Sequence, residues 1–224
     1  MYQTGRGISQ SDVEAVKWYR KAAEQGDAEG QKSLGLMHMN GRGVSQSDEE
    51  AVVWYRKAAE QDDAEGLKLL GFMYEKGRGV PQSAKQAVKW YKKAAEQGNA
   101  SGQNSLAVMS MNGQGIPQSD VEAVKWFKKA AEQGDADGQN NLGNMYMNGR
   151  GVSQCAEEAV KWYKKAADQE KQRNKDMQKD KELLDSCMYV GEVWPSLLRR
   201  RVSGSEKQQN KVMQSDKGIW EICF

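Results

Sequence analysis

The sequence has few apolar residues and no long apolar run. Only 38% of its 224 residues are hydrophobic, and 8% are aromatic. This apolar content is too low to form one globular core, so apolar side chains must be buried locally along the chain. No apolar run approaches the ~20 residues of a membrane span, and no signal-peptide pattern opens the chain. We therefore expect a cytoplasmic protein without a membrane partner.

The net charge and the cysteine content exclude further kinds of site. A formal net charge of +2 gives little attraction to nucleic acid or to an anionic membrane. The cysteines are too few and too scattered for a disulfide framework or a zinc site, and they lie at Cys155, Cys187 and Cys223. We expect no nucleic-acid partner, no metal and no cofactor.

A repeat of 36 residues dominates the sequence. Pairs of glycines recur with this spacing, and so does tryptophan, at Trp18, Trp54, Trp90, Trp126 and Trp162. Each unit contains two apolar patterns of helical period separated by chain-breaking residues, which predicts a helical hairpin. The expected fold class is therefore all-α, with about five such hairpins in tandem.

The first helix of each hairpin begins at a capping box, in which a Ser and a Glu or Gln side chain bond to exposed backbone N–H groups. The four boxes are Ser11 with Glu14, Ser47 with Glu50, Ser83 with Gln86, and Ser119 with Glu122. The fifth copy has Cys155 instead, which predicts a helix start weaker by roughly 1 kcal/mol, the alternative role being a reactive thiol. The helix ends at glycine in three copies but at Asp62 in the second, where we expect strain.

The second helix of each hairpin starts at an Asp or Asn cap and contains repeated glycines. Gly30 and Gly35 in the first copy should each cost ~1 kcal/mol relative to alanine. Their recurrence in register predicts close helix packing, where a side chain would not fit. The Gly-Arg-Gly element that follows lacks the preceding strand and the Gly-Lys-Ser/Thr of a phosphate-binding loop, so it predicts a turn.

The tryptophans, "KAAEQGDA", "LGxMY" and "GxGV" at this period closely resemble the Sel-1-like repeat family, relatives of the tetratricopeptide repeats, over residues 1–168. The resemblance implies an α/α solenoid, a right-handed superhelix whose concave surface holds partner proteins. We therefore expect a monomer with a protein or peptide partner. Glycine stands at four positions where the family usually has alanine, which implies looser second helices. The opening "MYQTGRG" aligns with "MYEKGRG" at Met73, which predicts a truncated first repeat with sequence missing upstream.

Residues 169–224 resemble no repeat and predict a separate polar tail, with two possible origins. In a shifted reading frame, Met177-Gln178 and Met213-Gln214 both encode alanine, and these alanines are 36 positions apart, as a further repeat requires. The alternative is an authentic basic tail. Either origin predicts disorder, because the segment has little apolar area to offset its ordering entropy.

By resemblance to the tetratricopeptide arrangement, the concave surface takes one face of each second helix, at spacings i, i+3, i+7 and i+10 or i+11. Methionine and phenylalanine there would give adaptable apolar contacts, and asparagine would clamp a peptide backbone. The alternative is a generic solvated face whose apolar members pack between helices. The predicted partner-binding residues are Glu29, Lys32, Leu36, Met39, Lys68, Phe72, Glu75, Lys76, Asn104, Val108, Met111, Asn140, Asn144 and Met147.

Catalytic groups are scarce. His38 is the only histidine and occupies the slot of Tyr74 and Tyr146, which predicts a packing role rather than acid–base chemistry. Some bacterial members of the family resemble β-lactamases or penicillin binders, but those carry paired cysteines in each repeat. We therefore expect a non-catalytic interaction scaffold or adaptor. The alternatives are a small-substrate hydrolase and a nonfunctional fragment.

Overall fold

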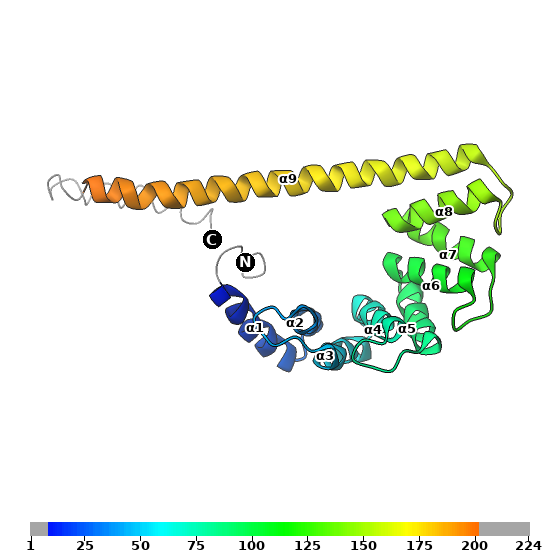
Figure 1. Ribbon diagram of the computed structural model, residues 1–224, viewed down its shortest axis with the longest axis horizontal. Coiled ribbons are helices and arrows are strands. Elements are labelled where there is room, and N and C mark those ends of the chain that lie inside the picture. Colours follow the sequence, from blue (N-terminus) through cyan, green and yellow to red (C-terminus); the bar gives the residue numbers. More distant parts are fainter. Residues whose placement is uncertain (1–8, 202–224) are drawn as a thin grey trace. The chain divides into compact units, whose positions relative to one another are not determined.

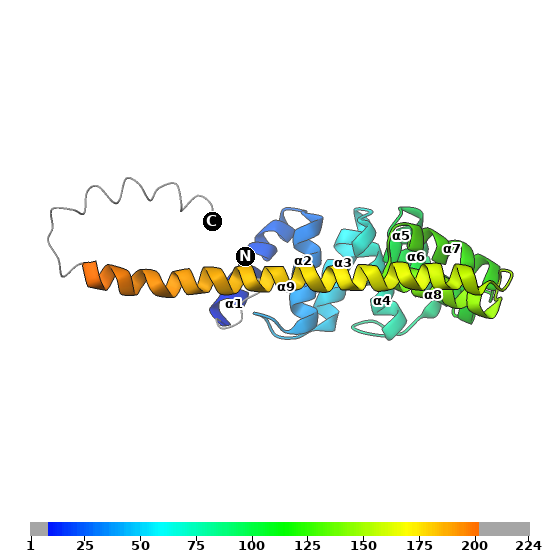
Figure 2. The ribbon, with the colours of Figure 1, turned by 90° about the horizontal axis from the view of Figure 1, so that it is seen from above.

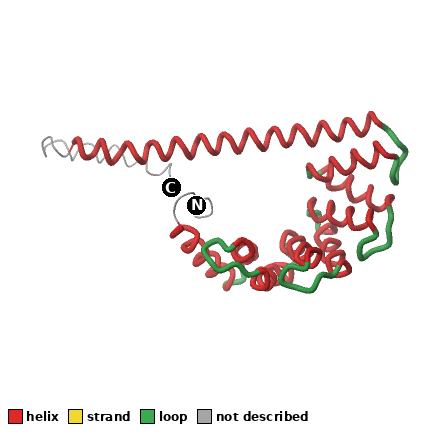
Figure 3. The backbone as a smooth tube through the Cα atoms, viewed as in Figure 1, coloured by secondary structure: helices red, strands yellow, loops and turns green. Residues whose placement is uncertain are grey.

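Every regular element that the structure describes is a helix. The structure, a computed structural model, describes the backbone of residues 9–201 and the side chains of residues 12–179 and 182. Within residues 9–201 there is no strand, and short turns join the helices (Figures 1 and 3). The helices are α1 (Ser9–Glu24), α2 (Ala28–Asn40), α3 (Asp48–Glu60), α4 (Ala64–Lys76), α5 (Ala84–Glu96), α6 (Ala100–Asn112), α7 (Asp120–Glu132), α8 (Ala136–Asn148) and α9 (Ala156–Arg201). The predicted all-α solenoid is confirmed.

The chain divides into two units, Met1–Glu170 and Lys171–Phe224. In the first unit α1 to α8 follow one another in chain order along the stack (Figure 2). In the second unit the described residues continue α9 to Arg201, although the sequence predicted disorder there. The exposed residues 171–179 are rich in Lys and Gln, and hydrogen bonds at i,i+4 such as Gln172 to Asp176 (2.9 Å) support a helix that has no apolar face. The division at residue 168 and the origin of the tail stay predictions.

Helices α3, α5 and α7 start at serine caps, as predicted, but the predicted cap at Ser11 is wrong, because α1 begins at Ser9 and Ser11 lies inside it. The Ser47, Ser83 and Ser119 hydroxyls accept the N–H of the residue three positions later at 3.1, 3.3 and 3.2 Å. The reciprocal bond of the capping box is not formed, because each serine N–H instead donates to a carbonyl of the preceding helix, as Ser47 does to His38 at 2.9 Å. Cys155 keeps this backbone bond, to Tyr146 at 2.9 Å. The serine position therefore ties each hairpin to the next.

Glycine inside the even-numbered helices allows close helix packing, as predicted. A Cβ at Gly66 would lie 2.7 Å from the Ala58 Cβ, and one at Gly71 would lie 2.7 Å from the Tyr91 ring. Such distances are well inside van der Waals contact. The glycines that replace the family's usual alanine, such as Gly66, therefore let the two helices of a hairpin approach closely, and the looser second helices stay a prediction.

The Gly-Arg-Gly elements are turns that close each hairpin. Gly77 and Gly79 have φ of 67° and 66°, in the left-handed region. Arg78 between them donates to the two carboxylate oxygens of Asp48 at 2.6 and 2.9 Å, and Asp48 begins the first helix of the same hairpin. In the third copy Gln114 replaces the arginine and Ala84 replaces the aspartate, so both members of the pair are absent together.

Each hairpin packs its apolar side chains on its neighbour. Trp54 joins a cluster with residues of α1 and α2 and is only 7% exposed. Trp18, at the same repeat position in α1, is 58% exposed because no described helix precedes it. Tyr55, Tyr91 and Phe127 are fully buried between hairpins. Burial is thus local and repeated, as the low apolar content requires.

Asp62→Gly is expected to raise the free energy of unfolding by about 0.5–1 kcal/mol. Asp62 has φ of 57°, where the first, third and fourth copies have glycine, and its exposed side chain makes no hydrogen bond or ion pair with any described residue. Urea denaturation followed by circular dichroism measures the change. The reverse substitution, Gly98→Asp, should lose a similar amount. Lower stability of Asp62→Gly would show that the aspartate makes a favourable contact.

Candidate interaction surface

The even-numbered helices form one continuous surface of the first unit. Figure 1 shows α2, α4, α6 and α8 along the inner side of the curve that the helices follow, with α1, α3, α5 and α7 on the outer side. Consecutive even-numbered helices contact one another. We call the side chains that α2, α4, α6 and α8 expose on this side the even-helix surface. All the predicted partner-binding residues belong to these four helices.

Those residues differ in how much of each side chain is accessible. Four are exposed: Glu29, Lys76, Asn144 and Met147. The others are half-buried: Lys32, Leu36, Met39, Lys68, Phe72, Glu75, Asn104, Val108, Met111 and Asn140. None of the fourteen is fully buried, so the assigned face is the accessible one.

Several of the apolar members also pack between helices. Phe72 contacts two core clusters, one centred on α3 and α4 and the other on α5 and α6. Met39 packs on the first of these, while Val108 and Met111 pack on a cluster of α7 and α8. Because Phe72 joins neighbouring hairpins, its replacement would change stability as well as any binding. Among the predicted partner-binding residues, Met147 is the most accessible apolar side chain, at 37% exposure.

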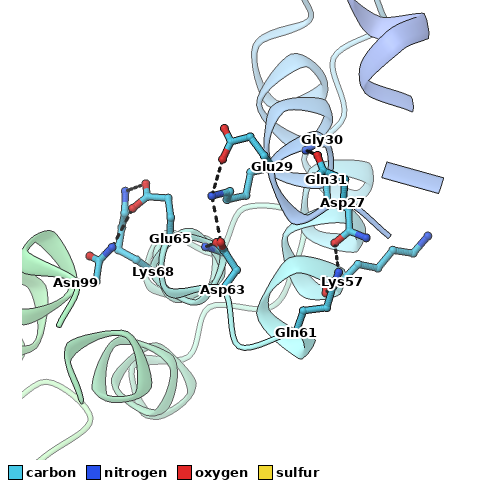
Figure 4. Close-up of polar contacts among 12 residues, drawn as sticks. Asp27, Glu29, Gly30, Gln31, Lys57, Gln61, Asp63, Glu65, Lys68 and Asn99 are labelled. Atoms are coloured by element: carbon cyan, nitrogen blue, oxygen red, sulfur yellow. Dashed lines mark hydrogen bonds and ion pairs between the residues drawn. The ribbon is translucent and has the colours of Figure 1, made fainter. Parts of the chain in front are cut away.

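The lysines at the N-terminal ends of α2 and α4 are already paired (Figure 4). Lys32 Nζ lies 2.9 Å from Glu29 Oε2 and 3.2 Å from Asp63 Oδ2. Burial opposes the charged form, but the hydrogen bonds to the two carboxylates outweigh it and raise the pKa of the Lys32 ammonium. Lys68 Nζ lies 2.6 Å from Glu65. These charges stabilise the stack and are not left over for a partner.

Tyrosine hydroxyls reach this surface from the odd-numbered helices, which the sequence analysis missed. Tyr91 donates to Glu75 Oε2 and Tyr163 donates to Asn144 Oδ1, both at 2.7 Å. Burial, reinforced by Glu75, raises the pKa of the Tyr91 hydroxyl, so it stays a neutral donor. The signal was the tyrosine that follows four of the five tryptophans, with Phe127 as the exception.

The α6 and α8 part of the surface is rich in amides and poor in charge. α6 contains no charged residue, and α8 contains only Asp137. Asn141 donates to Asn104 Oδ1 at 2.9 Å. The Asn104 amide NH2 and the whole Asn140 side chain make no hydrogen bond to any described residue. Here, unlike on α2 and α4, polar groups are available to a ligand.

His38 lies inside the fold. Its side chain is 8% exposed, and neither ring nitrogen has a hydrogen-bond partner among the described residues.

No group of three or more His, Cys, Asp or Glu able to hold a metal was found among the described residues. No helix in the described part of the chain is both long enough and apolar enough to cross a membrane.

These features define an α/α repeat protein of the solenoid class. A family model described as the Sel1 repeat matches five consecutive segments, residues 1–27, 28–63, 64–99, 100–135 and 136–171. The chain belongs to the Sel1 repeat family.

Solved structures of the family resemble this chain over most of its length. One is c5321, a protective antigen of uropathogenic Escherichia coli with an SLR fold, at 37% identity and a TM-score of 0.65, covering 73% of this chain and 38% of c5321. Another is a Sel1 repeat protein from Oxalobacter formigenes, at 37% identity and a TM-score of 0.67, covering 70% of this chain and 62% of that one. This chain thus spans less than two thirds of either relative. A comparison with curated proteins found no match.

Proposed function

We propose that this chain is a non-catalytic scaffold that binds an extended peptide segment of a protein partner on the even-helix surface. The observation that carries the proposal is the uncharged, amide-rich part of that surface on α6 and α8, with side-chain groups that no described residue uses. The scaffold is proposed to act as a monomer without a cofactor.

The chemistry of these side chains suits an extended backbone. Each Asn amide offers two N–H donors and one acceptor oxygen, so it can pair with both the C=O and the N–H of a peptide unit. The amides are spaced along the surface, with Asn104 on α6 and with Asn140 and Asn144 one turn apart on α8. This spacing suits an extended, strand-like ligand. Met147 adds an adaptable apolar contact beside them.

The lysines of α2 and α4 are proposed to have a secondary part. Lys32 and Lys68 are 15% and 21% exposed and already ion-paired, so a partner would have to displace their carboxylates. Displacing a partly buried ion pair costs desolvation energy that a new pair must first offset. We therefore place the peptide backbone mainly over α6 and α8.

Met147→Arg is expected to weaken peptide binding at least tenfold. The probe is a 12-residue peptide selected on the purified chain from a random phage-displayed library, and its Kd is measured by fluorescence anisotropy. An arginine at this exposed position removes an apolar contact and places a bulky charge where the peptide lies.

The matched control is Val121→Arg, which puts the same side chain at a 54% exposed apolar position of α7 on the outer side. It should change Kd less than twofold, and circular dichroism should show unchanged helix content in both variants. Equal losses from the two substitutions, or no loss from Met147→Arg, would contradict the assigned surface.

A further inference from the structure

The even-numbered helices contact one another in three places, α2 with α4, α4 with α6, and α6 with α8, and we call each of these places a joint. At the first joint the fifth residue of α2 is ion-paired with the capping residue of α4, and the other two joints have their fifth residue and their cap at the same repeat positions. The fifth residue is Lys32, Lys68 or Asn104, and the facing cap is Asp63, Asn99 or Asp135. The joints share a backbone arrangement but differ in charge, so each serves as a reference for the others.

The first joint holds an ammonium group between two carboxylates. Lys32 Nζ contacts Glu29 Oε2 at 2.9 Å and Asp63 Oδ2 at 3.2 Å, and the lysine side chain is 15% exposed. The Oδ1 atom of the same Asp63 accepts the Gly66 N–H at 2.7 Å. One carboxylate therefore caps a helix and binds a cation at the same time.

The second joint keeps its lysine and has an uncharged cap. Lys68 Nζ contacts Glu65 Oε1 at 2.6 Å, and Glu65 Oε2 accepts the Asn99 amide at 3.1 Å (Figure 4). The charges of Lys68 and Glu65 cancel, whereas the first joint has two carboxylates for one ammonium. Asn99 still caps α6, because its side-chain oxygen accepts the Gly102 N–H at 2.7 Å.

The third joint keeps the carboxylate and has lost the lysine. Asn104 stands in place of Lys32, and its oxygen is bonded to Asn141 at 2.9 Å. Asp135 caps α8 through the Gly138 N–H at 2.7 Å and forms no ion pair with any Lys, Arg or His of the described chain. Burial, together with nearby Asp137, raises the pKa of the Asp135 carboxyl, and Lys68 offsets this only from a distance. Among the three joints, this is the one in which a capping carboxylate has no ion pair with a cation of the described chain.

We propose that the third joint binds the ammonium or guanidinium group of a Lys or Arg side chain of the bound peptide, at the place beside Asp135 that corresponds to Lys32 Nζ beside Asp63. The inference rests on the proposed function, since it assigns one side chain of the same peptide ligand. The first joint is the independent observation that points to the ligand, because there the equivalent carboxylate already holds an ammonium in this very protein.

A basic side chain fits this joint better than a metal ion does. The described residues offer no group of three His, Cys, Asp or Glu able to hold a metal, and the neighbouring polar groups are amides. An ammonium needs one or two carboxylates, of which Asp135 provides one with Asp137 in the first turn of the same helix. A peptide whose backbone is bound by the amides of Asn104 and Asn140 could present a basic side chain to this joint.

The test uses the 12-residue peptides selected from the random library, in buffer containing EDTA so that divalent metals do not contribute. The selected peptides should share a Lys or Arg at one fixed position, and changing it to Gln should raise Kd at least tenfold on the unmodified chain. On the Asn104→Lys variant, which supplies an ammonium in cis, the same change should raise Kd less than twofold. The Asp135→Asn variant should likewise remove the preference while keeping the cap, as Asn99 does at α6.

The matched control is Asp27→Asn, the same change at the cap of α2, where no even-numbered helix precedes in the described chain. It should leave the tenfold Lys-to-Gln difference intact. Peptides that bind the even-helix surface without a shared basic residue, or a preference that survives Asp135→Asn, would overturn this inference and leave the proposed function standing. Failure to select any peptide for that surface would overturn both.

Discussion

The Gly79→Ala variant is expected to lose about 3–4 kcal/mol of unfolding free energy, the sum of left-handed backbone strain and an unavoidable overlap. Gly79 has φ of 66° in the turn that closes the second hairpin. A Cβ there would overlap the Asp48 carbonyl group and the Glu49 backbone nitrogen at the start of α3. Because these neighbours are backbone atoms of a helix, no side-chain rotation relieves the overlap. Urea denaturation followed by circular dichroism measures the loss.

Gly98→Ala is the control for this experiment. Gly98 also has a positive φ, of 86°, but nothing lies within 4 Å of the Cβ position. This variant should lose only about 1–2 kcal/mol, the strain alone. Equal losses at the two positions would show that conformation, and not the contact between turn and helix, makes glycine necessary in the turn.

The Gly71→Ala variant is expected to lose about 2 kcal/mol, in the range of an overpacked core. Its Cβ would lie 2.7 Å from Tyr91 Cδ1. The Tyr91 ring resists displacement because its hydroxyl is bonded to Glu75 at 2.7 Å. Without that bond, the ring would be freer to shift. At the equivalent positions of the next repeat the chain has alanine and phenylalanine, a ring without a hydroxyl, and these residues, Ala107 and Phe127, pack together in one cluster.

The double variant Gly71→Ala/Tyr91→Phe should therefore be more stable than the sum of the single changes predicts, by about 1 kcal/mol. Tyr91→Phe alone should lose about 1 kcal/mol, the usual contribution of one hydrogen bond. The thermodynamic cycle of the four proteins gives the coupling free energy. A coupling near zero would show that the Tyr91 hydrogen bond does not hold the ring against the added Cβ. The occurrence of Ala107 together with Phe127 would then have no structural cause.

The sequence predicted the helices and their caps because these depend on residues three or four positions apart. The serine caps at Ser47, Ser83 and Ser119 and the aspartate cap at Asp63 follow from such short spacings. The reciprocal half of the capping box was wrong, because the Ser47 N–H is taken by a carbonyl of another helix. That competition depends on tertiary contacts, which local pattern does not contain.

The contacts that shape the candidate surface could not be predicted for the same reason. Lys32 meets Asp63 across 31 residues, and Arg78 meets Asp48 across 30. Both pairs depend on how the helices of the stack pack, not on the repeat spacing alone. The tyrosine hydroxyls at Glu75 and Asn144 were missed because each bond joins residues 16 or 19 positions apart on different helices. The partner-binding role of the even-helix surface itself stays a prediction.

Photo-crosslinking tests the central claim most directly. A selected 12-residue peptide carrying p-benzoylphenylalanine at successive positions is irradiated with the purified chain, and mass spectrometry identifies the residues joined to it. The account predicts crosslinks on the even-numbered helices, concentrated on α6 and α8 at residues such as Met111 and Met147. Crosslinks concentrated on α1, α3, α5 and α7 would contradict it, because the peptide would then lie on the outer side of the stack.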